Sequence, residues 1–175
     1  MIDVKIRKVH PDAVIPFRAH TTDAGMDVTA ISMEMTEDYV EYDTGLQFQL
    51  PEGYAMLIFP RSSNSKKDLL LCNSVGILDA GYTGNLKLRF KLTTEGYTEK
   101  IYNPGDKVGQ IMIIPYPEIN FIETEVFNET ERGDGGFGST AKITDIDPVV
   151  NSEPAQVAPA TEEPKKKSRK RKKKE

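Results

Sequence analysis

Several polar segments of the chain carry residue types that could bind and cleave a phosphorylated ligand. In PRSSNSKK (residues 60–67), Arg61 and the hydroxyls of Ser62 and Ser63 come directly after an apolar segment. A guanidinium binds phosphate oxygens through a planar fork, and hydroxyls can donate to the same oxygens. This segment therefore predicts a phosphate contact, although an ordinary surface turn can have the same composition.

A glycine-rich segment, ERGDGGFGST (residues 131–140), combines one cation, one aromatic ring and two hydroxyls. Four of its ten residues are glycine, and the others include Arg132, Phe137, Ser139 and Thr140. Glycine-rich segments are most often linkers. The alternative is a lid that closes over a ligand that is both anionic and flat. The segment lacks the G-x-x-x-x-G-K-S/T pattern, which excludes a P-loop.

Three further polar segments place a carboxylate or an amide beside apolar residues. Asp27 lies in TTDAGMDVTA, and Gln110 lies in NPGDKVGQIM. Asp79 and Tyr82 lie in CNSVGILDAGYTGNLKL, for which a β-hairpin with Asp79 at its turn is predicted. Taken singly, each of these residues fits a surface turn or a strand edge as well as a site.

Composition excludes several other kinds of site. His10 and His20 are the only histidines and neither has a spaced partner, which argues against a histidine metal site or a catalytic triad. The single cysteine, Cys72, cannot form an internal disulfide and favours a reducing compartment. Its apolar setting, LLLCNSV, predicts a buried small side chain.

The chain carries no sign of export or of a membrane anchor. No run approaches the roughly 18 consecutive apolar residues that a membrane helix needs. The first ten residues, MIDVKIRKVH, have no apolar signal core. We therefore expect an intracellular protein without membrane contact, in the cytoplasm or, because of its basic tail, in the nucleus.

Alternation of apolar and polar residues predicts the elements that hold these segments. Residues 2–7 and 86–92 alternate with period two, as half-buried strands do. Residues 54–59 (YAMLIF) and 111–116 (IMIIPY) are continuous apolar runs, closer to fully buried strands, and 119–127 is a further strand candidate. Short strands between regular turn signals predict an all-β fold, a jelly-roll-like sandwich or barrel.

Composition also divides the chain into three parts. Residues 1–130 are predicted to form the β core, residues 131–146 a glycine-rich arm, and residues 147–175 a disordered Pro, Ala and acidic linker followed by a basic tail. The segment 165–174 (KKKSRKRKKK) holds nine of the 23 Lys and Arg residues, and without residues 165–175 the net charge falls from −4 to −12. An acidic body therefore carries a strongly basic tail.

In their order and spacing, the five polar segments resemble the five motifs of the trimeric deoxyuridine triphosphatases (dUTPases). The matching stretches, in motif order, are residues 24–30, 60–63, 76–84, 105–110 and 132–140. The resemblance implies a homotrimer of β jelly rolls with active sites at the subunit interfaces. It also implies Mg²⁺ as cofactor and hydrolysis of dUTP to dUMP and pyrophosphate, which limits uracil incorporation into DNA and supplies dUMP for thymidylate synthesis.

The resemblance also implies a role for each site residue. Asp79 would be the general base that activates the attacking water, and Arg132 would reach the γ-phosphate. Asp27 would hold Mg²⁺ through water ligands. Tyr82 would pack against the deoxyribose and leave no room for a 2′-hydroxyl. The other substrate-binding residues would be Arg61, Ser62, Ser63, Asn73, Gly76, Gln110, Phe137, Gly138, Ser139 and Thr140.

Among these residues, Asn73 and the backbone of motif three would read the uracil edge, and Phe137 would close over the uracil ring. Arg61, Ser62 and Gln110 would surround the α- and β-phosphates. Among the departures from the family pattern, Lys107 stands where arginine is common and Gly109 where alanine is usual. Neither departure removes a catalytic group.

Two rival interpretations stay open at this point. A dCTP deaminase has the same fold and motif layout, but its catalytic glutamate falls at the position of Arg89 in this chain. A nucleic-acid-tethered or regulatory protein is suggested by residues 165–174, because Lys and Arg clusters bind phosphate backbones with strong salt dependence. Such clusters also resemble nuclear-import signals, or can be a solvated tail without a specific partner.

Overall fold

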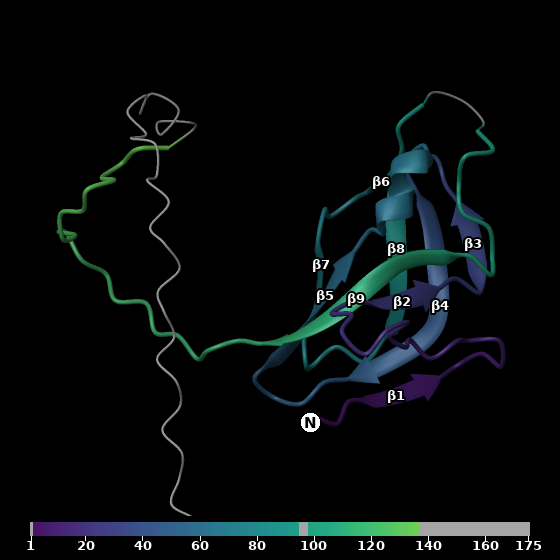
Figure 1. Ribbon diagram of the computed structural model, residues 1–175, viewed down its shortest axis with the longest axis horizontal. Helices are drawn as coiled ribbons and strands as arrows, with labels where there is room; N and C mark the ends of the chain where they lie inside the picture. Colours follow the sequence, from purple (N-terminus) through teal and green to yellow (C-terminus); the bar gives the residue numbers. More distant parts are fainter. Residues whose placement is uncertain (1, 95–97, 137–175) are drawn as a thin grey trace, which may run out of the picture. The chain divides into compact units, whose positions relative to one another are not determined.

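The structure, a computed structural model, describes residues 2–94 and 98–136, which form two antiparallel β-sheets (Figure 1). Sheet A has the strand order β1-β4-β8-β6, with β3 also paired to β4. Its strands are β1 (Lys5–Lys8), β3 (Ser32–Met35), β4 (Val40–Gln49), β6 (Leu69–Leu71) and β8 (Asn85–Leu92). Sheet B has the order β2-β9-β5-β7. Its strands are β2 (Met26–Thr29), β5 (Tyr54–Phe59), β7 (Gly76–Leu78) and β9 (Lys107–Pro115).

The predicted all-β, jelly-roll-like sandwich is confirmed. A 3₁₀ turn, η1 (Ser62–Lys66), is the one helical element in the described ranges, and no described helix is long and apolar enough to cross a membrane. In β8, Leu86, Leu88 and Phe90 are buried while the alternating lysines and arginine face outward. Strand alternation thus places one face of sheet A in the core, as the period-two pattern predicts.

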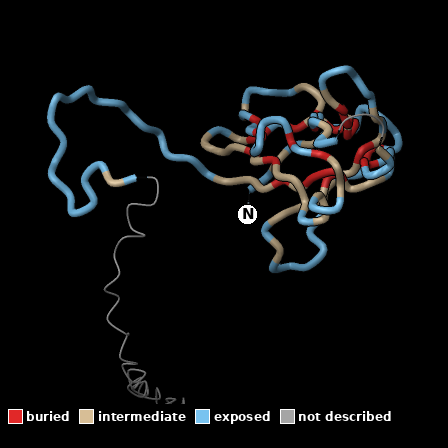
Figure 2. Tube along the Cα trace, turned by 90° about the horizontal axis from the view of Figure 1, so that it is seen from above, coloured by how far each residue is buried: buried red, intermediate tan, exposed pale blue. Residues whose placement is uncertain are grey.

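The two sheets pack face to face through their apolar rows. Leu88 of sheet A lies so close to Gly109 of sheet B that a Cβ atom at Gly109 would approach Leu88 Cδ2 to 2.5 Å and the Phe59 carbonyl oxygen to 3.1 Å. This contact explains the glycine at a position where alanine is usual in motif four. Most of the buried residues lie in strands, and Figure 2 shows them gathered in one part of the trace.

An aromatic cluster fills one end of the core. The rings of Tyr42, Phe90 and Tyr102 meet edge to face at centroid distances of 5.7 to 6.0 Å. Tyr42 Oη donates to the Tyr102 carbonyl at 3.0 Å and accepts from the Tyr102 N–H at 3.1 Å. Burial raises the pKa of Tyr42 to about 12, so this hydroxyl stays protonated.

A bulge bends β4 so that one strand can pair along its length with β1, β3 and β8. The β4–β8 register shifts between Asp43 and Gln47, and Gly45 within the bulge has φ +63°. A Cβ atom at Gly45 would also lie 2.6 Å from Ile31 Cδ1. The left-handed backbone and the close approach both require glycine here.

Three local predictions are wrong. Residues 72–88 do not form a β-hairpin, because β7 pairs with β5 in sheet B, whereas β8 lies between β4 and β6 in sheet A. Residues 119–127 form no strand, and Phe121, Ile122, Val126 and Phe127 are 79 to 90% exposed. A strand needs a partner edge, and no described strand pairs with this segment.

The third error concerns the two apolar runs, residues 54–59 and 111–116, which are buried on one face only. Met56, Ile58 and Ile111 are buried, whereas the side chains that alternate with them are partly exposed. These runs were predicted to be buried on both faces, but within one chain sheet B is covered on one side.

The chain divides into two units, Met1–Phe121 and Ile122–Glu175. In the second unit the structure describes residues 122–136, which contain bends and turns and are almost entirely exposed. Gly133 has φ +53° and closes a turn with Thr130. The boundaries predicted at residues 130 and 146 stay predictions, and residues 147–175 lie outside the described part.

Candidate active site

A compact cluster of charged side chains forms around the carboxylate of Asp27. Asp27 lies in β2, and its Oδ1 accepts a hydrogen bond from Arg61 Nε at 2.8 Å. Its Oδ2 accepts from Lys107 Nζ, at the start of β9, at 2.9 Å. The three groups are each partly buried, and together they carry one more positive than negative charge. The cluster therefore suits an anionic ligand.

The register of sheet B explains why these segments meet. Asp27 is opposite Gln110, and Gln110 is opposite Phe59, the last residue of β5. The chain then continues into Pro60 and Arg61, and Gln110 Nε2 donates to the Pro60 carbonyl at 3.0 Å. Strand pairing therefore brings together side chains that are up to 83 positions apart in the sequence, from Asp27 to Gln110.

Two small residues complete this cluster. Arg61 Nη1 donates to Ser63 Oγ at 3.2 Å, which helps to orient the guanidinium. At Gly25, a Cβ atom would lie 2.6 Å from Gln110 Oε1, so a larger residue would displace the amide. Gly25 and Gln110, with Asp27, also line a hollow of about 280 Å³ beside the cluster.

The cluster fixes the charge of Asp27. Burial by itself would raise the pKa of this carboxyl, but hydrogen bonds and charge attraction from Lys107 and Arg61 outweigh burial and lower the pKa below its ordinary value. Asp27 is therefore ionised at neutral pH. An ionised Asp27 holds the two cations at one edge of sheet B.

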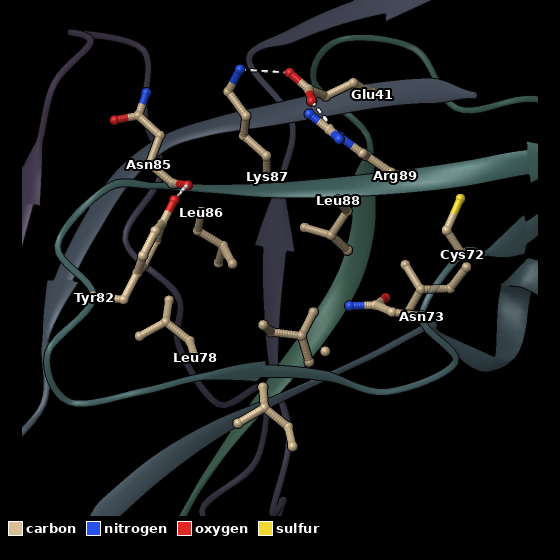
Figure 3. A pocket seen from close by; sticks show the side chains of 14 residues that line it. Glu41, Cys72, Asn73, Leu78, Tyr82, Asn85, Leu86, Lys87, Leu88 and Arg89 are labelled. Carbon is tan, nitrogen blue, oxygen red and sulfur yellow. Dashed lines mark hydrogen bonds and ion pairs between the residues drawn. The ribbon is translucent and has the colours of Figure 1, made fainter. Parts of the chain in front are cut away.

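A separate cleft of about 410 Å³ opens where the two sheets part (Figure 3). After β6, the N–H of Cys72 donates to the Arg89 carbonyl at 3.0 Å, and the chain then crosses to sheet B as β7. No described strand pairs with the edge of β8 that this crossing leaves behind at residues 85–88. Apolar side chains form the floor of the cleft: Ile58, Leu71, Leu78, Leu86 and Leu88.

Polar residues stand at the rim of this cleft. Asn73 and Tyr82 line it from the two segments that flank β7. Gly76 keeps room for the Asn73 amide, because a Cβ atom at Gly76 would lie 3.2 Å from Asn73 Nδ2 and 3.0 Å from Ile58 Cδ1. Cys72 also lines the cleft and is exposed, so its predicted burial is wrong. Leu69 and Leu71 before it are buried in the core, but the chain leaves sheet A at Cys72.

Asp79 follows β7 directly, at the start of a turn. Its carbonyl accepts the N–H of Tyr82 at 3.0 Å, and the Asp79 side chain is exposed. The ring of Tyr82 is half exposed, and its Oη donates to the Asn85 carbonyl at 3.2 Å. The turn thus presents a free carboxylate and an aromatic ring beside the cleft.

Comparison with known proteins shows the family of the chain. Residues 12–141 match the family model described as dUTPase. The chain belongs to the dUTPase family. It is 37% identical over 142 residues to the deoxyuridine 5'-triphosphate nucleotidohydrolase of Thermobifida fusca (strain YX), with 79% of each chain covered. It is 35% identical over 148 residues to the enzyme of that name from Burkholderia lata, with 81% of this chain and 98% of the relative covered.

Solved dUTPase structures have the same fold. A variant of the Staphylococcus bacteriophage 80alpha dUTPase, with dUpNHpp, gives a TM-score of 0.70 at 27% identity and covers 80% of this chain and 99% of its own. A variant of the dUTPase from phage phi11 of S. aureus gives a TM-score of 0.61 at 28% identity and covers 72% of this chain and 99% of its own. The latter structure is described with the coordination of a structural Mg(II) ion.

The predicted dUTPase site residues fall into two groups. Asp27, Arg61, Ser63 and Gln110 meet in the charged cluster, with Ser62 exposed beside them at the start of η1. Asn73, Gly76 and Tyr82 line the cleft, with Asp79 at the turn next to it. No residue that lines the cleft belongs to the cluster.

The remaining predicted residues belong to motif five. Arg132 is exposed, and its Nε donates to the Gly135 carbonyl at 3.0 Å within its own turn. Phe137, Gly138, Ser139 and Thr140 lie outside the described residues. The roles assigned to motif five stay predictions.

The residues of the cluster fit Mg²⁺ as an indirect partner only. Both carboxylate oxygens of Asp27 already accept hydrogen bonds from cations, and the described ranges contain no group of three or more His, Cys, Asp or Glu side chains that could hold a metal. Mg²⁺ usually keeps several waters and is bound by one or two carboxylates plus substrate phosphates. Contact with Asp27 through water is compatible with this donor set.

Sequence reasoning missed an ionic network that lines one side of the cleft. Glu41 in β4 is 6% exposed, and its two oxygens accept hydrogen bonds from Lys87 Nζ at 2.5 Å and Arg89 Nε at 2.7 Å in β8. The Arg89 guanidinium also lies 4.4 Å from the ring centre of Tyr39. Glu41 is directly opposite Arg89 in the β4–β8 ladder. Opposite charges on paired strands are the feature of the sequence that could have indicated this network.

We predict that Glu41→Gln lowers the free energy of unfolding by about 1–2 kcal/mol at pH 7. Burial would raise the pKa of Glu41, but the hydrogen bonds from Lys87 and Arg89 outweigh it and hold the pKa below its ordinary value of 4.5. The stabilisation is therefore present above pH 4.5 and is lost as the pH falls through the lower folded-state pKa. Urea unfolding at several pH values tests this. A difference between wild type and variant that does not shrink in acid would contradict it.

Proposed function

We propose that this chain hydrolyses dUTP to dUMP and pyrophosphate. The observation that carries the proposal is the division of the matched motifs into a cationic cluster and an apolar cleft with a polar rim. A nucleoside triphosphate has the same division, with a charged chain at one end and a flat base at the other. The family relationship and the names of the relatives support the same activity.

The cleft is suited to a pyrimidine base. Its floor is apolar, and the edge of β8 over residues 85–88 offers backbone donors and acceptors that no described strand uses. The Asn73 amide at the rim supplies one more donor and one more acceptor. Hydrogen bonds of both kinds to a base edge can distinguish uracil from cytosine, in which donor and acceptor are exchanged.

The charged cluster is suited to the phosphates. Arg61 offers nitrogen donors beyond the one that binds Asp27, and Gln110 and Ser63 lie beside it. Mg²⁺, when bound to the phosphates, would neutralise part of their charge, and Asp27 would contact it through water. Asp27 would therefore orient the cations of the cluster, and Gln110 would offer its amide to the phosphates.

Asp79 has the position and the chemistry of the general base. Its carboxylate is exposed at the turn next to the cleft, where it can accept a proton from a water molecule. The water would attack the α-phosphorus, and the pyrophosphate would leave with the bonding electrons. Phosphoryl transfer depends mainly on positioning and charge stabilisation, so one carboxylate can supply the proton acceptor.

Motif five would complete the site. Arg132 and the hydroxyls of Ser139 and Thr140 would contact the γ-phosphate, with Gly138 allowing close approach of the backbone. Phe137 would stack on the uracil ring. In this role the segment 131–140 is a lid, as its mixture of glycine, cation, aromatic ring and hydroxyls suggests.

We also propose that the working form is a homotrimer with active sites between copies. Within one chain the cluster and the cleft share no lining residue, which is compatible with a site that combines elements from more than one copy. Sheet B also presents an apolar outer face, which a single chain covers only in part. By strand register this face contains Ile77, Leu57, Met112, Phe59 and Ile114. Asp27 and Gln110 lie on the same face, next to this apolar row.

The structure disfavours the rival interpretation as a deaminase. Arg89 stands where a deaminase has its catalytic glutamate, and its guanidinium is bound to Glu41 and lies over Tyr39. A cation held in this way cannot serve as a proton-transferring acid and base. Weak nucleic-acid contact through residues 165–174 stays a prediction, because these residues lie outside the described part.

A substrate panel tests the proposed function. We expect pyrophosphate release from dUTP at a rate at least about 100-fold above that from dCTP, dTTP or UTP, because base edge and sugar are both recognised. Ion chromatography of the products would distinguish pyrophosphate from single phosphates. Release of ammonia from dCTP, or no turnover of dUTP, would contradict the proposal.

A further inference from the structure

The ring of Tyr82 is folded back over the backbone of its own turn. A Cβ atom at Gly84 would lie 2.5 Å from Tyr82 Oη, 2.7 Å from Cζ and 3.1 Å from Cε2. The ring therefore occupies the volume that any side chain at Gly84 would need. Gly84 has no positive φ, so its backbone does not require glycine. The space taken by the tyrosine is what excludes a larger residue.

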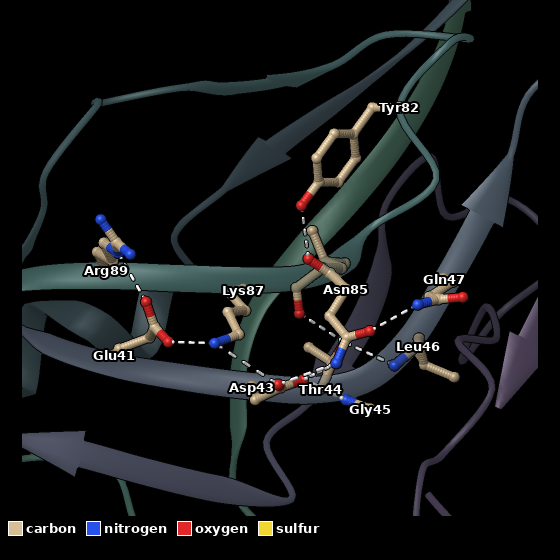
Figure 4. A network of polar contacts seen from close by, with 11 residues as sticks. Glu41, Asp43, Thr44, Gly45, Leu46, Gln47, Tyr82, Asn85, Lys87 and Arg89 are labelled. Atoms are coloured by element: carbon tan, nitrogen blue, oxygen red, sulfur yellow. Dashed lines mark hydrogen bonds and ion pairs between the residues drawn. The ribbon is translucent and has the colours of Figure 1, made fainter. Parts of the chain in front are cut away.

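The tip of the ring is held by the first residue of β8. Tyr82 Oη donates to the Asn85 carbonyl at 3.2 Å (Figure 4). The Asn85 side chain in turn donates to Asp43 Oδ2 at 3.1 Å and accepts from Gln47 Nε2 at 2.9 Å. Both partners lie at the β4 bulge, where Asp43 Oδ1 also accepts the N–H of Gly45 at 2.7 Å. The carbonyl that receives the tyrosine hydroxyl is thus anchored to the bulge.

These contacts matter because little else restrains the ring. Tyr82 is half exposed and does not belong to the hydrophobic core. An exposed aromatic side chain changes rotamer readily unless local contacts hold it. The gap above Gly84 and the Asn85 carbonyl are the local contacts that the structure provides.

We propose that Gly84 and Asn85 are positioning residues that determine the selectivity for deoxyribose. They hold the Tyr82 ring at the mouth of the cleft, in the place where it can exclude a 2′-hydroxyl. This inference rests on the proposed function, because it assumes that the base of dUTP occupies the cleft. A ring that is free to swing away would give a ribonucleotide room without removing any group that binds the base or the phosphates.

Gly84→Ala is the direct test. The methyl group would displace the far end of an exposed side chain, so the fold is expected to survive, as thermal unfolding would show. We expect the ratio of kcat/KM for UTP to kcat/KM for dUTP to rise about 10- to 100-fold. The change in the ratio should come mainly from better use of UTP. Damage to the fold would instead lower the rates for both substrates together.

Two further variants separate displacement of the ring from other effects. Gly81→Ala is the matched control, because a Cβ atom at Gly81 meets nothing within 4 Å in the same turn. It should leave the substrate ratio unchanged. In a Tyr82→Ala background there is no ring to displace. Adding Gly84→Ala should therefore not raise the ratio of kcat/KM for UTP to kcat/KM for dUTP any further. Asn85→Ala removes the anchor at the bulge and should relax the ratio by a smaller factor, about 3- to 10-fold.

The outcomes are distinguishable. If wild type hydrolyses dUTP selectively and Gly84→Ala leaves the ratio unchanged, the positioning role is wrong while the proposed function stands. If wild type does not hydrolyse dUTP, the proposed function fails and the inference falls with it. If Gly84→Ala folds but turns over neither substrate, the ratio of the dissociation constants of UMP and dUMP is measured instead. An unchanged binding ratio overturns the positioning role, and a ratio shifted toward UMP supports it.

Discussion

Asp79→Asn is expected to lower kcat for dUTP by about 10²- to 10⁴-fold while the dissociation constant of the substrate changes little. Asparagine has nearly the shape of aspartate but cannot accept a proton from the attacking water at neutral pH. The Asp79 side chain is exposed, and the carbonyl that accepts the Tyr82 N–H belongs to its backbone. The substitution should therefore remove the base without disturbing the turn.

Single-turnover kinetics and equilibrium binding of a non-hydrolysable dUTP analogue would separate the two effects. Asp38→Asn is a suitable control, because the Asp38 side chain is 82% exposed and lies in sheet A's β3–β4 turn, away from the matched motifs. The control should keep wild-type turnover. Wild-type turnover in Asp79→Asn would show that another group accepts the proton.

The charged cluster shows how far the sequence could predict the site. Asp27, Arg61 and Gln110 were singled out by residue type and by motif order, and the structure places them together. The partnership between Asp27 and Lys107 was not predicted, because it depends on the register of β2 against β9, with its shift after Val28. A register is set by three-dimensional pairing, and single-sequence patterns do not specify it.

The cleft shows more clearly what could not be predicted from the sequence. Turn signals in residues 72–88 are those of a hairpin, yet β7 and β8 join different sheets. Strand β4 pairs with β8 over residues 85–90 and β6 pairs with residues 90–92, whereas β7 pairs with the edge of β5 that β9 leaves free. Competition between edges for partners is a property of the whole sheet. The cleft exists because β7 leaves the edge of β8 unpaired.

Strand β4 was missed for a different reason. Its sequence, VEYDTGLQFQ, places a buried glutamate and a glycine bulge among the apolar residues, which interrupts the period-two pattern. The interruption has a physical role, because Glu41 binds Lys87 and Arg89, and the bulge at Gly45 anchors Asn85 through Asp43. The departures from a simple strand pattern are therefore the features that support the cleft.

The second prediction concerns assembly through the apolar outer face of sheet B. Met112→Glu is expected to convert the proposed trimer to monomers and to lower dUTP turnover by at least about 100-fold. Met112 is opposite Leu57, which is itself opposite Ile77, so the new charge would lie on the apolar outer face at the end of this row. Burying an unpaired carboxylate between copies costs several kcal/mol, enough to dissociate a protein interface.

The loss of turnover follows from the division of the site. In the proposed trimer the charged cluster and the cleft of one site come from different copies, so a monomer would lack the elements that its neighbour contributes. Misplacement of reacting groups by as little as 1 Å can cost about 100-fold in rate. The fold itself should survive, because Met112 is only partly buried and lies on the face of β9 opposite the core.

Sedimentation velocity and circular dichroism would measure assembly and fold in the same sample. Met35→Glu provides the control, since it makes the same substitution at a strand methionine that is 46% exposed in sheet A. The control should remain assembled and active. Raising the concentration of Met112→Glu should restore part of the activity, because association depends on mass action. A monomeric Met112→Glu with wild-type turnover would show that one chain builds a complete site, and would overturn the assignment of the site to subunit interfaces.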